Sequence, residues 1–164
     1  MSEEPPSDAS DGDLLGHVLV PVAHPDDAEH TVRALARLSP RPRHVTALHV
    51  VEKGGGVPDK TPVEQSEQLA EESFEVVRET FPDAGGEVRY GRDVVASILE
   101  AADDLGATAI AFRPREGGTI ERLLTGDLSI HLITEAELPV IALPRSNREE
   151  ADGAADADDA DGGA

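Results

Sequence analysis

Cysteine and tryptophan are absent from this chain, and other large aromatic side chains are rare. Among 164 residues there are three phenylalanines and one tyrosine, and apolar runs reach only the length of a β-strand. Without cysteine the chain has no disulfide, no thiolate zinc site and no thiol nucleophile. No run approaches the ~20 apolar residues that a membrane-spanning helix needs. Because the N-terminal segment is also acidic and polar, unlike a targeting peptide, we predict a cytoplasmic protein with no membrane insertion.

Basic residues are scarce as well. Asp and Glu number 34 against 14 Lys and Arg, which gives a formal net charge of −20, and only Lys53 and Lys60 are lysines. Such a field disfavours nucleic acids and anionic lipid surfaces as partners. An acidic surface with few lysines resembles proteins from organisms that keep molar salt in the cytoplasm, where a Debye length of ~3 Å screens self-repulsion. We therefore interpret the chain as halophilic in type; the alternative is that only its tails are unusual.

Charge and composition divide the chain into three parts. Residues 1–13 contain five acidic residues and no basic one, and residues 147–164 are a low-complexity acidic segment. Neither segment has enough apolar surface to offset the entropy of ordering, so we predict that both are disordered tails. Residues 14–146 remain as one domain, long enough to enclose a hydrophobic core.

Short apolar runs alternate with amphipathic segments across this domain. The patterns predict five strands, at 17–22, 44–51, 87–90, 107–112 and 139–144, and four helices, at 26–38, 63–81, 93–106 and 127–135. Asp26 or Asp27 is the expected cap of the first helix. This alternation predicts an α/β fold, a Rossmann-like five-stranded parallel sheet with helices on both faces. In such sheets ligands bind beyond the carboxyl ends of the strands, where the strand order reverses.

The segment AHPDD, residues 23–27, contains metal-ligand residue types directly after the first strand. It is similar to the motif of zinc hydrolases of the glucosamine-deacetylase (PIG-L-like) family. A zinc hydrolase needs about three converging ligands and a water position, and no distant third ligand is evident from the sequence. The simpler interpretation is a helix entrance, with Pro25 in the first turn and Asp26 and Asp27 complementing the helix dipole. We prefer it and predict no metal site.

Four segments of the chain match a known family in order and spacing. They are HVLVPV with DAEHTVRALARL, VTALHVVE, DVVASILEAADDLGATAIAF and the closing ELPVIALP. Through them, residues 17–144 resemble the universal stress protein family. The resemblance implies an adenine nucleotide alpha hydrolase-like sheet of strand order 3-2-1-4-5 and a non-catalytic regulatory or stress-response role. It also implies a homodimer through the edge of the last strand, formed here by Val140, Ile141, Ala142 and Leu143.

In that family the loop after the fourth strand typically reads Gly-x-x-Gly, nine residues, then Gly-Ser or Gly-Thr, and its amides approach the phosphates of ATP. An aspartate at the end of the first strand commonly contacts the adenosine. Aligning Gly126-Asp127 with Gly-Ser places Arg113 and Glu116 on the two earlier glycines and Ala23 on the aspartate. Of these five positions, only Gly126 keeps the family's residue.

These departures lead to a specific hypothesis about the site. Asp127 or Glu116 occupies the anion site internally, paired with Arg113, Arg115 or Arg122. ATP is then not expected to bind in the family's usual way, and no cofactor is expected.

Three other interpretations remain open. Arg113, Arg115 and Gly117-Gly118 form a different pocket for ATP or another small anion, since arginine forks suit phosphate and carboxylate groups. Alternatively, these arginines are ordinary surface charges. A less favoured possibility is a zinc-dependent hydrolase using the AHPDD segment. No nucleophile–base pair is evident, because Ser97 and Ser129 lie within predicted helices without an evident histidine partner, so we do not expect an enzyme.

Overall fold

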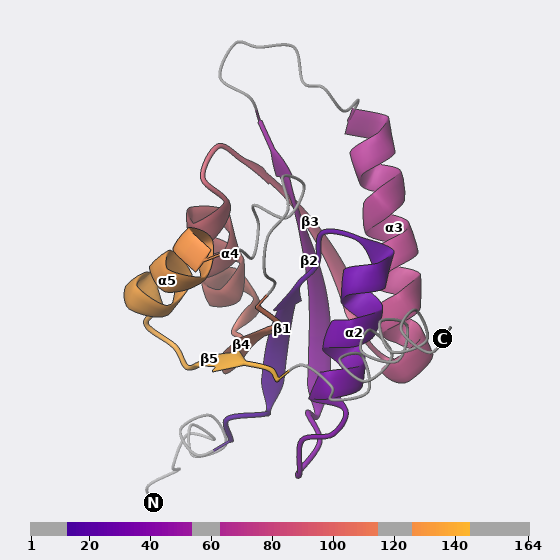
Figure 1. The fold of residues 1–164 in the computed structure, drawn as a ribbon, viewed down its shortest axis with the longest axis vertical. Helices are drawn as coiled ribbons and strands as arrows, with labels where there is room; N and C mark the ends of the chain where they lie inside the picture. Colours follow the sequence, from indigo (N-terminus) through magenta and orange to yellow (C-terminus); the bar gives the residue numbers. More distant parts are fainter. Residues whose placement is uncertain (1–12, 54–62, 115–125, 145–164) are drawn as a thin grey trace, which may run out of the picture.

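The computed structural model describes residues 13–53, 63–114 and 126–144, with the side chains of 126–128 outside the description. It shows a five-stranded, fully parallel sheet of order β3-β2-β1-β4-β5, between two helical layers (Figure 1). The strands are β1 (His17–Pro21), β2 (His44–Glu52), β3 (Gly85–Gly91), β4 (Ala109–Phe112) and β5 (Val140–Ala142). The predicted α/β fold and its strand order are confirmed.

Helices cover both faces of the sheet. They are α2 (Pro25–Leu35), α3 (Val63–Thr80), α4 (Val94–Leu105) and α5 (Gly126–Glu135). In Figure 1, α2 and α3 lie on one side of the sheet, while α4 and α5 lie on the other. Among the described residues, no helix is both long and apolar enough to cross a membrane.

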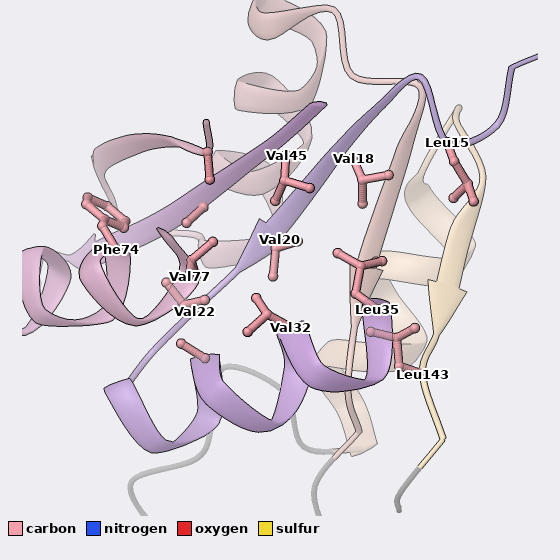
Figure 2. Packing of buried hydrophobic residues seen from close by; sticks show 14 of the residues in the cluster. Leu15, Val18, Val20, Val22, Val32, Leu35, Val45, Phe74, Val77 and Leu143 are labelled. Carbon is pink, nitrogen blue, oxygen red and sulfur yellow. The ribbon is translucent and has the colours of Figure 1, made fainter. Parts of the chain in front are cut away.

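Side-chain alternation along the strands separates two hydrophobic cores. Val18, Val20 and Val22 belong to the core under α2 and α3, where Figure 2 shows Val18 and Val20 facing Leu35 and Val32 of α2. Residues at alternate strand positions, among them Leu19, Leu48, Ile110 and Phe112, belong to the core under α4 and α5. Because both faces of the sheet are covered, the strands read as nearly continuous apolar runs.

The start of α2 differs from the prediction. Neither Asp26 nor Asp27 caps the helix: the N-cap position is His24, without a side-chain capping bond, and Pro25 follows it in the first turn. The prediction was wrong because proline suits this position, where its missing N–H costs nothing and its fixed φ is helical. The helix also ends at Leu35 rather than Leu38, with 3₁₀-type bonds from the amides of Arg37 and Leu38 extending the last turn.

The ends of α4 follow their sequence signals. Asp93 is the N-cap, and its side chain accepts a hydrogen bond of 3.0 Å from the amide of Ala96. Gly106 ends the helix at φ 66°, in the left-handed region that glycine adopts readily. The predicted range 93–106 therefore begins and ends at the two caps of the observed helix.

β3 begins two residues before the predicted start, at Gly85-Gly86. A Cβ built on Gly86 would lie 2.5 Å from the ring of Phe74 in α3, so only glycine allows the helix to pack this closely. Glycine is depleted from strands generally, and for that reason the strand pattern began only at Glu87.

Candidate functional site

The strand order reverses between β1 and β4. The chain runs from β1 through β2 to β3, and then crosses back to place β4 on the other side of β1. In such sheets, ligands bind beyond the carboxyl ends of the strands at this switch point. Ala23 lies two residues beyond β1, and Arg113 directly follows β4. Since β1 and β4 are parallel neighbours, the fold brings these two predicted site residues together at the carboxyl end of the sheet.

Arg113 is buried where the resemblance places the first glycine of the phosphate loop. Its exposed fraction is 8%, although the next residue, Pro114, is exposed. A glycine at this position would leave the backbone bare for a ligand, whereas an arginine adds a long side chain, which is buried here. A guanidinium in such a place also needs polar surroundings to offset its desolvation.

The carboxyl end of β1 leads directly into α2. Ala23 is half-buried and offers a methyl group in place of the family's carboxylate. His24 follows at the N-cap, and its carbonyl accepts a bond of 3.0 Å from the amide of Ala28. Asp26 is exposed in the first helical turn, but Asp27 is only 1% exposed. The burial of Asp27 was not predicted, because two adjacent aspartates at a helix start look alike in a sequence.

His49 of β2 is a second buried group that sequence reasoning missed. Its exposed fraction is 6%, and its Nδ1–H donates to the carbonyl oxygen of Val22 at 3.1 Å. Burial lowers the pKa of His49 below its usual value, and the nearby His24 lowers it further, against the opposing effect of the bond to Val22. His49 is therefore neutral near pH 7 and adds no positive charge to this edge. The position of His49 within an apolar strand was the feature of the sequence that could have predicted its burial.

Other predicted site residues are only partly described. Arg115, Glu116 and Arg122 lie outside the described residues, as does Gly117-Gly118. Gly126 is the first residue of α5 and Asp127 falls in its first turn, but the side chain of Asp127 is not described. The internal filling of the anion site by Asp127 or Glu116 therefore stays a prediction.

The AHPDD segment contains one histidine, His24, and two aspartates, Asp26 and Asp27. Across 13–53, 63–114 and 126–144, no group of three or more His, Asp or Glu side chains is placed to hold a metal ion. His24 serves as the helix N-cap, and Asp26 is exposed while Asp27 is buried, so the segment is used structurally as a helix entrance.

β5 forms one outer edge of the sheet, beside β4. Val140 and Ile141 are half-buried and Ala142 is exposed, so part of the predicted dimer edge lies at the surface. Leu143 differs: it is 3% exposed and packs in the core beneath α2, with its amide donating to the carbonyl of Phe112 at 2.8 Å. Its side chain stabilises the protomer.

Comparisons with known proteins agree with this architecture. The family model described as "Universal stress protein family" matches residues 15–144. The structure of the universal stress protein from Archaeoglobus fulgidus is 24% identical with a TM-score of 0.59, covering 79% of this chain and 98% of that one. UspA from Lactobacillus plantarum is 21% identical with a TM-score of 0.58, covering 79% and 98%. A universal stress protein solved in complex with cAMP is 15% identical with a TM-score of 0.56, covering 80% and 98%.

The search of curated proteins gives no match. The solved structures share the fold at low identity, and the family model extends over nearly all of the predicted domain. This chain belongs to the universal stress protein family.

Proposed function

We propose that this protein is a non-catalytic regulatory or stress-response member of its family that does not hold ATP in the family's usual way. The observation that carries this proposal is Arg113, a large cationic side chain with only 8% of its surface exposed at the end of β4. The family's phosphate loop needs bare backbone amides at this position. A packed side chain there removes the space through which a phosphate approaches the backbone.

The first strand supports the same conclusion. Ala23 replaces the aspartate that commonly contacts the adenosine in the family, and a methyl group accepts no hydrogen bond. A nucleoside bound here would lose one charge-assisted hydrogen bond, a contribution of about 1.5–3 kcal/mol.

His49 does not compensate for these losses. A protonated histidine at this edge would attract phosphate, but burial keeps the pKa of His49 low and its ring neutral. Its Nδ1–H is already used by the Val22 carbonyl. The neighbouring ring nitrogen is then an acceptor, which suits a hydrogen-bond donor and not a phosphate oxygen.

The assembly we expect is a homodimer, as members of this family often form. β5 is the proposed contact, because an outer strand presents unpaired backbone groups that a second copy can pair with. The residues of this outer strand are Val140, Ile141 and Ala142.

Calorimetric titration with ATP–Mg²⁺ in high-potassium buffer tests the proposal. We expect no measurable heat from the wild-type protein. Asp127→Ser restores the family's residue at the start of α5, and combining it with Arg113→Gly also bares the backbone after β4, so we expect the double variant to gain binding. Arg33→Ser, on the exposed side of α2, is the matched control for loss of an arginine. Circular dichroism checks that each variant is folded, and tight binding of ATP by the wild type would overturn the proposal.

A second function, binding of a different small anion through Arg113, is favoured by the position of this cation at the switch point. Structural relatives have been solved with dAMP and with cAMP, so these two nucleotides are the appropriate probes. Heat from dAMP or cAMP that disappears in Arg113→Gly but persists in Arg33→Ser would support the binding module over the nucleotide-independent regulator.

A further inference from the structure

The amino end of the sheet carries two exposed arginines, Arg41 and Arg43, that lie away from the family's nucleotide site. Between residues 30 and 51 the chain has no acidic residue, although the whole protein contains 34. This segment includes four arginines, of which Arg41 and Arg43 lie in the connection between α2 and β2. Figure 1 shows that this connection lies at the lower end of the molecule, opposite the carboxyl ends of the strands.

A pocket of about 250 Å³ opens at this place. It is lined by residues 41–45, from the α2–β2 connection and the start of β2, and by residues 80–84, from the end of α3 and the α3–β3 connection. The two connections meet because β2 and β3 are parallel neighbours, so both strands begin at the same end of the sheet. The volume is below the range of about 300–1,000 Å³ that is usual for drug-sized ligands, which points to a small molecule.

Arg41, Arg43 and His44 line the pocket, and hydrogen bonds hold the backbone of the last two in place. The amide of Arg43 donates to the carbonyl of Leu15 at 2.9 Å, and that of His44 donates to the carbonyl of Gly16 at 3.1 Å. The guanidinium of Arg41 lies over the ring of Phe81, 5.2 Å from the ring centroid. A cation–π contact of this kind orients the guanidinium without neutralising its charge.

Two carboxylates oppose this positive charge. Asp83 lines the pocket, and Asp13 forms an ion pair with Arg43, its carboxylate oxygen lying 3.1 Å from Nε. Arg41 has no carboxylate partner among the described residues, so its charge remains available to a ligand. Arg43 is shared between Asp13 and the pocket, and its side chain is 77% exposed.

A second cavity at this end of the sheet shows the opposite character. It measures about 560 Å³ between the ends of α4 and α5, and it is lined by four carboxylates, those of Glu100, Asp103, Glu135 and Glu137. An anion is repelled there. At ordinary ionic strength the Debye length is about 8–10 Å, so the local side chains outweigh the net charge of the whole chain in deciding where an anion binds.

We propose that the pocket between the α2–β2 and α3–β3 connections binds a small dianion of the phosphate class, through Arg41 and Arg43. The planar guanidinium offers paired N–H donors that match the oxygens of a phosphoryl group. The ligand is either inorganic phosphate or the phosphoryl group of a small phosphomonoester. The site is separate from the switch point and does not depend on whether the protein binds ATP.

Amide NMR titration of the full chain, with inorganic phosphate and with glycerol 3-phosphate at constant potassium chloride, tests this site. We expect both probes to shift amide signals in residues 41–45 and 80–84. Shifts confined to residues 22–24 and 113 would place the anion at the switch point and overturn the proposal. Tenfold tighter binding of glycerol 3-phosphate would identify a phosphomonoester as the ligand, whereas equal affinities would identify inorganic phosphate.

Two substitutions with opposite expected effects sharpen the test. Arg41→Gln removes the unshared cation and should weaken phosphate binding about tenfold or more, the cost of one charge-assisted hydrogen bond. Asp13→Asn removes the competitor for Arg43 and should tighten binding about threefold, within the range of exposed ion pairs. Arg33→Gln is the control, because Arg33 pairs with Glu29 on α2, away from the pocket. Equal affinity in Arg41→Gln and Arg33→Gln, or weaker binding in Asp13→Asn, would overturn the proposal.

Discussion

The carboxyl and amino ends of the sheet place their basic side chains in opposite ways. At the carboxyl end, Arg113 is 8% exposed, whereas at the amino end the side chain of Arg43 is 77% exposed. A buried cation fills space that a ligand would need, while an exposed cation at the rim of a pocket can meet a ligand. The presence of arginine in a loop therefore does not by itself identify an anion site. Whether the arginine can bind an anion depends on how deeply its side chain is buried.

The histidines of β1 and β2 also differ in burial between the two ends of the sheet. His17 and His44 are register partners at the amino ends, with ring centroids 4.7 Å apart in an edge-on arrangement, and Nε2 of His17 lies 2.8 Å from Oγ1 of Thr46. At the carboxyl ends, His49 is buried against the Val22 carbonyl. His17 is half-buried and His44 is exposed, whereas His49 is buried, so the two ends should respond differently to mutation and to pH.

The largest expected difference between the ends concerns their phenylalanines. Phe112 is fully buried at the end of β4, and Phe112→Ala should lower the free energy of unfolding by about 3–5 kcal/mol through lost burial and a cavity. Phe81 is only half-buried at the amino-end pocket, so Phe81→Ala should cost about 1 kcal/mol. Urea unfolding at fixed salt measures both. Similar losses in the two variants would contradict the idea that the carboxyl end is the more tightly packed.

Two threonine hydroxyls provide the next test, with effects of opposite sign. Thr31 of α2 is fully buried and its hydroxyl has no hydrogen-bond partner within the described residues, so Thr31→Val should raise the free energy of unfolding by about 1 kcal/mol. At the amino end, Oγ1 of Thr108 accepts from the amide of His17 at 2.9 Å and lies 3.0 Å from the Leu14 carbonyl. Thr108→Val should therefore lower the free energy by about 1 kcal/mol. Thermal unfolding of the two variants gives the direction of each stability change. A destabilised Thr31→Val would show that the Thr31 hydroxyl has a hydrogen-bond partner.

The smallest expected effect is the response of stability to pH. Burial lowers the pKa of both His17 and His49 in the folded protein, and His44 and His24 respectively lower each pKa further. The unfolded chain then binds more protons below the usual value of 6.5, so stability should be fully present above it and fall as the pH drops towards the folded pKa values.

Urea unfolding between about pH 5.5 and 7.5 measures this slope, in a window above the ordinary titration of carboxyl groups. His49→Gln should flatten the slope more than His17→Gln, because His49 is the more deeply buried ring. A slope that neither substitution changes would mean that other groups carry the pH dependence.

Local signals in the sequence predicted most of the fold. The alternation of apolar runs and amphipathic segments gave the order of strands and helices, and Asp93 and Gly106 marked both ends of α4. The start of α2 was misplaced because two aspartates competed with Pro25 as signals for the same helix end. Resemblance to a family supplied the strand order, which periodicity does not contain.

The candidate site was predictable only in part. Motif alignment identified Ala23, Arg113 and Gly126 as positions of the family's nucleotide motif, and the fold brings Ala23 and Arg113 together at the carboxyl end of the sheet. The alignment did not show that Arg113 is buried or that His49 contributes to this edge. Burial depends on what packs against a side chain, and those neighbours come from distant parts of the chain.

The sequence by itself determined the alternating elements, the acidic charge and the departures from the family's phosphate motif, because each depends on residue types and their spacing along the chain. Only the tertiary structure decided that Arg113 is enclosed while Arg41 and Arg43 line an open pocket. The physical reason is the parallel register of β2 with β3, which joins residues 41–45 to residues 80–84 across a long separation in sequence. No local sequence pattern predicts that these two segments lie side by side.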